Sequence, residues 1–169
     1  MRSRIVALGL AVAVTVPLLA GCSSMGSMST YGGKTAKVAE ISNIGDYTAD
    51  SALAEAKAHF KNGDFGYSAA LYKRAVELQP KNAEAYVGLS ASYDRLRRFD
   101  LSDRVYAALH DLTGSTVQYY NNVGYSYLLR GNLSAAMTNF RKAQKIDPEN
   151  VVVANNIQIV SNAAAAARA

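Results

Sequence analysis

Large and small residues recur along this chain at an interval of 34 residues, in registers that begin at residues 49, 83, 117 and 151. Aromatic residues recur at position 24 of the period, and small residues recur at position 20. These residues are Tyr72, Tyr106 and Phe140 at position 24, and Ser68, Ser102 and Ala136 at position 20. Small side chains let antiparallel helices approach closely, and aromatic rings fill the remaining space. A period of this length indicates stacked helical hairpins and predicts an all-α fold.

The same period predicts the bounds of the helices. The first helices are expected at 49–62, 83–96 and 117–130, and the second helices at 66–79, 100–113 and 134–147. Gly63 and Gly131 fall between paired helices, where a left-handed residue ends the first helix. Pro80 and Pro148 follow second helices and stop them. We therefore predict three hairpins at 49–82, 83–116 and 117–150, followed by a capping helix and tail at 151–169.

The pattern resembles the tetratricopeptide repeat, and repeat three carries the resemblance best. Its matching residues are Gly124, Tyr127, Gly131, Ala136, Phe140, Ala143 and Pro148. The resemblance implies a solenoid of three helix-turn-helix repeats with a C-terminal capping helix. Repeat two departs from the family pattern, with Arg97 in place of Gly, Leu109 in place of Ala and Gly114 in place of Pro. These changes put its turn geometry in question more than its helices. An ordinary helical bundle, the alternative, leaves the fixed period unexplained.

Residues 1–21 have the pattern of a cleaved export signal. Arg2 and Arg4 precede an apolar run of 16 residues that ends at Ala20, shorter than the ~20 residues of a membrane-spanning helix. The run Leu19-Ala20-Gly21-Cys22 resembles the lipobox of bacterial lipoproteins. That resemblance implies a diacylglyceryl group on the Cys22 thiol and a further acyl chain, such as palmitate, on its amine. Two or more acyl chains give a stable membrane anchor. A plain secretory signal that ends in cysteine is the alternative.

Residues 23–45 show no helical or strand period and are rich in Ser, Gly, Met and Thr. We therefore predict that residues 22–48 are the lipidated cysteine and a flexible tether, with a mean reach of about 25–30 Å. A segment that orders on contact with a partner is the alternative. In a Gram-negative host, Ser23 after the lipidated cysteine is compatible with outer-membrane sorting. The resemblance thus implies an outer-membrane lipoprotein that faces the periplasm.

Composition and charge disfavour an enzyme, a metal carrier or a nucleic-acid-binding protein. The chain has 18 Lys+Arg against 13 Asp+Glu, and without Arg2 and Arg4 the balance is 16 against 13, or +3. Nucleic-acid binding requires a basic face, and the export signal opposes cytoplasmic access. Cys22 is the only cysteine, and His59 and His110 lack metal-ligand spacing. With no nucleophile elbow or phosphate-binding glycine loop, we expect no catalytic residue, cofactor or metal site.

In tetratricopeptide arrays the first helix of each repeat lines the concave face, so the resemblance implies a peptide-binding groove there. The candidate residues are Lys57, Phe60, Val87, Asp94, Asn121, Tyr125, Leu128 and Asn155. Tyr125 and Leu128 could receive an apolar side chain of the partner. The family's carboxylate clamp requires Lys and Arg, whereas the matching positions here are mostly apolar or acidic. A receptor for a chaperone tail is therefore disfavoured.

Asn121 and Asn155 occupy the same repeat position, 34 residues apart. Carboxamides offer both donors and an acceptor, so a spaced pair can bond the backbone of an extended peptide. The alternative is that these two residues bond neighbouring helices or water. Asn122 and Asn156, one residue further on, are expected to serve helix packing.

The stretches 120–126 and 153–157, with the anchor and the short array, resemble the tetratricopeptide lipoproteins of tight-adherence (Flp-type) pilus assembly. This resemblance implies a membrane-anchored adaptor. It would bind an extended segment of an envelope protein during assembly of a pilus or secretion system. The alternative is the same scaffold serving outer-membrane protein assembly or cell-wall hydrolases. An enzyme would need a convergent cluster of titratable groups, which the sequence does not indicate.

Overall fold

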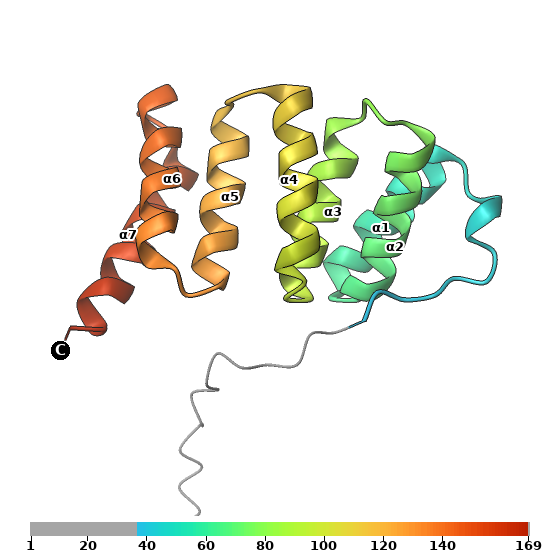
Figure 1. Cartoon of the computed structure of the whole chain (residues 1–169), viewed down its shortest axis with the longest axis horizontal. Coiled ribbons are helices and arrows are strands. Elements are labelled where there is room, and N and C mark those ends of the chain that lie inside the picture. Colours follow the sequence, from blue (N-terminus) through green and yellow to red (C-terminus); the bar gives the residue numbers. More distant parts are fainter. Residues whose placement is uncertain (1–36, 169) are drawn as a thin grey trace, which may run out of the picture. The chain divides into compact units, whose positions relative to one another are not determined.

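A computed structural model describes residues 37–168, and in this part of the chain α-helices stack side by side in chain order (Figure 1). The helices are α1 Ala49–Asn62, α2 Phe65–Leu78, α3 Ala83–Arg95, α4 Phe99–Thr113, α5 Val117–Leu129, α6 Leu133–Ile146 and α7 Val151–Ala166, preceded by a short 3-10 helix, η1 Ile44–Asp46. The described residues include no strand, which confirms the predicted all-α fold. No helix among them has the length and apolar character needed to cross a membrane. The predicted export signal and Cys22 lie outside the described residues.

Polar residues begin the first helix of each repeat and α7. Thr48 and Ser51 form a reciprocal capping box at the start of α1. The side chains of Asn82, Thr116 and Asn150 accept hydrogen bonds from backbone amides at the starts of α3, α5 and α7. These bonds satisfy amide donors that have no partner inside the helix. The bounds of α1 to α6 lie within one residue of those that the period predicts.

A residue in the left-handed conformation separates the two helices of every repeat. Gly63 and Gly131 have φ of 84° and 78°, and Arg97 at the equivalent position has φ of 59°. Glycine adopts this conformation without steric cost, whereas a side chain costs roughly 1–2 kcal/mol. The turn of repeat two therefore keeps the geometry of the other two despite the departure in sequence. The Arg97 guanidinium lies 5.3 Å from the centroid of the Phe99 ring.

Glycines in two of the helices lie directly against aromatic rings. A Cβ on Gly124 of α5 would be 2.7 Å from Cδ1 of Phe140, another of the residues that match the repeat. A Cβ on Gly88 of α3 would be 2.1 Å from Cζ of Tyr72, which belongs to the preceding repeat. The period does not reveal the second contact, because Gly88 occupies a position where the other repeats have larger residues. Glycine is thus required both within and between repeats.

The apolar core is divided along the array. One group of clusters belongs to the first two repeats and centres on Tyr72 and Tyr93. Another belongs to repeat three and α7 and centres on Phe140. Between them, the Ser126 hydroxyl of α5 donates a hydrogen bond of 2.7 Å to the buried Asp94 carboxylate of α3. Polar groups therefore link the second repeat to the third where the apolar core is interrupted.

Residues 37–48 pack on the first repeat, so the last part of the predicted tether is not free. The Ala39 amide donates a 3.1 Å hydrogen bond to the Gly66 carbonyl oxygen of α2. Val38 and Ile41 pack against the apolar cluster of the first two repeats. Both side chains are half-buried, and the apolar surface that they bury favours packing over a free chain.

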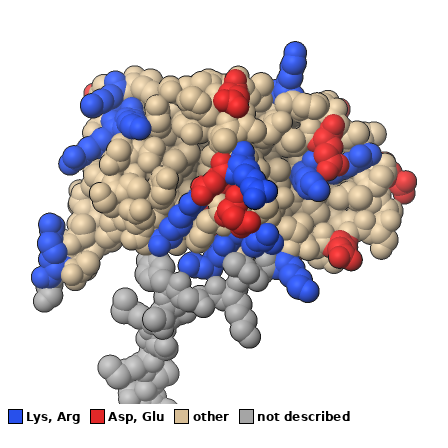
Figure 2. Space-filling view, viewed as in Figure 1, with Lys and Arg blue, Asp and Glu red and all other residues tan. Residues whose placement is uncertain are grey.

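Charged residues are sparse and mixed on the face that Figure 2 shows. Acidic and basic side chains lie beside one another near its middle, and most of the visible surface is uncharged. This face therefore offers no broad basic surface of the kind that nucleic-acid binding requires.

Candidate functional site

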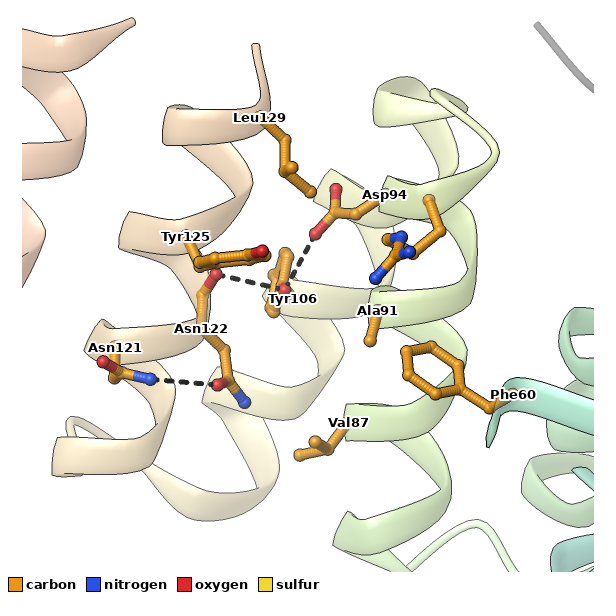
Figure 3. Close-up of a pocket in the computed structure, with 10 residues that line it drawn as sticks. Phe60, Val87, Ala91, Asp94, Tyr106, Asn121, Asn122, Tyr125 and Leu129 are labelled. Atoms are coloured by element: carbon orange, nitrogen blue, oxygen red, sulfur yellow. Dashed lines mark hydrogen bonds between the residues drawn. The ribbon is translucent and has the colours of Figure 1, made fainter. Parts of the chain in front are cut away.

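A pocket of about 140 Å³ lies between the first helices of the three repeats (Figure 3). Most of its lining comes from α1, α3 and α5, and one residue comes from α4. The lining residues are Phe60, Val87, Ala91, Asp94, Arg95, Tyr106, Asn121, Asn122, Tyr125 and Leu129. The pocket thus joins side chains that are far apart in sequence, because successive repeats place their first helices on one side of the solenoid.

Five of the eight predicted groove residues line this pocket: Phe60, Val87, Asp94, Asn121 and Tyr125. Phe60 reaches in from α1, and Tyr125 points across from α5, as Figure 3 shows. Tyr125 is 41% exposed, so its ring is accessible to a partner.

The other three predicted residues lie elsewhere. Lys57 forms an exposed ion pair with Glu84, with 2.6 Å between nitrogen and oxygen. Leu128 is half-buried against the apolar cluster of repeat three, while its neighbour Leu129 lines the pocket. Asn155 is exposed on α7. The pocket therefore occupies the middle of the predicted groove, and these residues lie around it.

Tyr106 is a pocket residue that the sequence pattern assigned only to the core. Its ring is buried at position 24, and its hydroxyl donates to Asp94 Oδ2 at 3.0 Å. The same hydroxyl lies 3.3 Å from the backbone carbonyl oxygen of Asn122. Burial, and then the charge of Asp94, raise the pKa of Tyr106 well above its usual range, so the hydroxyl stays a donor. Asn122, expected to serve helix packing, also lines the pocket.

Asp94 is a carboxylate at the buried side of the pocket, with only 4% of its surface exposed. Its two oxygens accept hydrogen bonds from Ser126 and Tyr106. Burial raises the pKa of Asp94, and the hydroxyls of Ser126, Ser102 and Tyr106 and the charge of Arg130 partly oppose that effect. Perturbed carboxylates of this kind are candidates for functional sites.

Arg130 reaches Asp94 only through Ser126. Its Nη2 donates to the Ser126 hydroxyl at 2.8 Å, and its Nη1 donates to Asp103 Oδ2 at 2.9 Å. The guanidinium is therefore paired with Asp103, an acidic residue of α4. None of the ion pairs found within residues 37–168 includes Asp94. The buried carboxylate is thus bonded by neutral hydroxyls and has no cation in direct contact.

Asn121 lies at the rim of the pocket and is linked to both α5 and α7. Its Oδ1 accepts a 2.8 Å hydrogen bond from Asn156, and its Nδ2 lies 3.5 Å from Asn122 Oδ1. Asn121 also lines a second hollow, which Asn150 and Val152 border at the start of α7. A segment that leaves the pocket along the solenoid would therefore pass this side chain.

The two histidines make local contacts. His59 Nδ1 lies 3.3 Å from Asp64 Oδ2, and its ring stacks on Tyr67. His110 Nε2 lies 3.2 Å from the Ser115 hydroxyl. Within residues 37–168, no three His, Cys, Asp or Glu side chains lie close enough together to hold a metal ion.

Comparisons with known proteins agree on the fold. Residues 117–150 match the family model described as tetratricopeptide repeat. No curated protein matches the chain in sequence. The first TPR domain of human RPAP3, solved by NMR, is 19% identical with a TM-score of 0.62, and the match covers 70% of this chain and 94% of that one.

Two similar solved structures contain peptides. The first TPR of Spaghetti (RPAP3), bound to the HSP90 peptide SRMEEVD, is 19% identical with a TM-score of 0.60 and coverage of 70% and 94%. The Yersinia enterocolitica type III secretion chaperone SycD, in complex with a peptide of the translocator YopD, is 13% identical with a TM-score of 0.57 and coverage of 66% and 91%. With three stacked hairpins and a closing helix, residues 49–166 have the fold of a solenoid of tetratricopeptide repeats, and residues 117–150 match the repeat in sequence.

Proposed function

We propose that this chain is an adaptor that holds an extended segment of another protein on the concave side of its repeats. The observation that carries the proposal is the pocket formed by the first helices of three successive repeats. Two solved structures with the same fold hold peptides, which supports the same use here.

The chemistry of the pocket suits a peptide side chain. Phe60, Val87 and Leu129 supply apolar contacts, and the amides of Asn121 and Asn122 supply donors and acceptors at one edge. A volume of about 140 Å³ is close to the ~150 Å³ of a cavity that accepts benzene. One side chain therefore fits, while a folded element does not, and the rest of the segment would lie along the first helices.

We place this adaptor at the envelope, as an acylated lipoprotein of the outer membrane that faces the periplasm. The lipobox-like run that ends at Cys22 supports the anchor. The resemblance of the stretches 120–126 and 153–157 to the lipoproteins of tight-adherence pilus assembly supports a role in assembling a Flp-type pilus or secretion system.

A photo-crosslinking experiment tests the adaptor. A photoreactive phenylalanine at Tyr125, in the pocket, should form an adduct with an envelope protein in intact cells. The matched control is the same residue at Tyr67 of α2, which has a similar exposed fraction of 49% but lies outside the pocket. The change Ala91→Leu, which fills the pocket, should remove the adduct. Equal adducts at both positions, or none at Tyr125, would contradict the proposal.

The anchor and the cellular role need separate tests. Mass spectrometry should find Cys22 acylated at the start of the mature chain, and Cys22→Ser should release the protein from the membrane fraction. Loss of surface pili in the Cys22→Ser strain would support the pilus role. If the strain keeps its pili but is depleted of outer-membrane proteins, a role in outer-membrane protein assembly would be favoured instead.

A further inference from the structure

We propose that the pocket binds a cationic side chain, arginine or lysine, of the captured segment and pairs it with Asp94. The inference rests on the proposed peptide-binding function and adds the chemistry of the residue that is recognised. In this arrangement the partner supplies the cation that Asp94 lacks in the free protein.

Asp94 has the capacity to accept further hydrogen bonds. An ionised carboxylate offers about four acceptor positions. The hydroxyls of Ser126 and Tyr106 use one on each oxygen, and one position is left even when the hydroxyl of Ser102 is counted as a third donor. A buried charge is unfavourable unless it is paired, and neutral donors compensate it only in part. The raised pKa of Asp94 agrees with that incomplete compensation. A cation that enters the pocket would therefore gain a partner that water screens little.

The charged side chains around Asp94 do not use its remaining acceptor positions. Arg130, the C-cap residue of α5, acts on the carboxylate through its charge, but it is bonded to Asp103 of α4 and contacts Ser126 in place of Asp94. Arg95 of α3 also lines the pocket, but its side chain is exposed and its guanidinium lies 4.4 Å from the centroid of the Phe65 ring. None of the ion pairs within residues 37–168 joins either arginine to Asp94.

The walls of the pocket suit the stem of a basic side chain. Phe60, Val87 and Leu129 are apolar and can contact methylene groups, as lysine and arginine stems require. The Tyr125 ring points across the pocket, as Figure 3 shows, and an aromatic face attracts a guanidinium or ammonium group. An acidic side chain, by contrast, would be repelled by Asp94.

Two small probes separate charge from shape. Butylguanidinium and butylurea have nearly the same size and planar shape, but only the first is charged at pH 7, and butylurea has a carbonyl oxygen in place of one NH2 group. Titrations of the full chain, followed by NMR at the Ala91 methyl group and the Tyr125 ring, should give a Kd at least tenfold lower for butylguanidinium. Asp94→Asn should abolish this preference. The matched control Asp111→Asn, which makes the same change of charge at an exposed residue of α4 outside the pocket, should retain it.

The outcomes are distinguishable. Equal affinity for the two probes, no binding of either, or a preference that survives in Asp94→Asn would each overturn the inference. If Asp94→Asn fails to fold, the affinities of the two probes for the unchanged chain still test the preference for a cation, since that comparison needs no substitution. An adduct at Tyr125 in cells without the cation preference would leave the adaptor standing and remove only the role of Asp94.

Discussion

Asn156 of α7 donates a 2.8 Å hydrogen bond to the side-chain oxygen of Asn121 in α5, 35 residues earlier in the chain. The sequence pattern pairs Asn121 with Asn155, one residue before Asn156. In the structure Asn155 is exposed, whereas Asn156 is only 9% exposed and contacts Asn121. The side-chain oxygen of Asn121 therefore bonds the capping helix α7, while the residue also lines the pocket.

We expect Asn121→Ala to lower the free energy of unfolding by about 1–3 kcal/mol, because it leaves the buried Asn156 amide without a partner. Asn155→Ala should change it by no more than about 0.5 kcal/mol, as at an exposed site. Urea unfolding of both variants measures these effects. Equal stability of the two would show that the bond contributes nothing.

Gly88→Ala should destabilise the protein by about 1–3 kcal/mol through overpacking against Tyr72. Alanine favours a helix over glycine by up to ~1 kcal/mol, but the new Cβ would lie 2.1 Å from the Tyr72 ring. The control is Gly45→Ala, where no atom lies within 4 Å of the new Cβ. Thermal unfolding compares the two, and an unchanged or higher melting temperature for Gly88→Ala would contradict the packing.

The Arg97→Gly variant should have an unfolding free energy about 1 kcal/mol higher than that of Arg97→Ala. The reason is that φ at this position is 59°, a value that only glycine adopts without steric cost. Both substitutions remove the contact between Arg97 and the Phe99 ring, so their difference isolates the backbone. Unfolding in urea measures this difference. Greater stability of the alanine variant would mean that the turn of repeat two differs from those of the other repeats.

Asp94→Asn should change how stability depends on pH. The pKa of Asp94 is raised in the folded state, with burial the largest cause, above the unfolded value of about 3.9. Folding therefore favours the protonated acid, and this stabilisation is complete below the unfolded pKa and is lost as pH rises through the folded pKa. The unfolding free energy of the unchanged chain, relative to Asp94→Asn, should thus fall from pH 3.5 to pH 7.

Urea unfolding across that range tests the prediction, and the difference between the two proteins removes the effect of the other carboxylates. A relative stability that rises with pH would show that the bonds from Ser126 and Tyr106 outweigh burial.

The sequence by itself determined the elements within each repeat. Small residues such as Gly124 and Ala136, aromatic residues such as Phe140, and the turn glycines recur with a constant period. Their contacts are made inside one hairpin, between residues close in the chain, so a local pattern predicts them. The three hairpins and the capping helix follow from that pattern, and the resemblance to the tetratricopeptide repeat implied five of the residues that line the pocket.

Only the tertiary structure decided how successive repeats meet. The bonds from Ser126 to Asp94 and from Asn156 to Asn121 join residues 32 and 35 positions apart. Whether such residues meet depends on the small rotation between one hairpin and the next, which sums over many packing contacts and which no single repeat encodes. For this reason the burial of Asp94, and the polar link between the two parts of the core, were not predictable from the period.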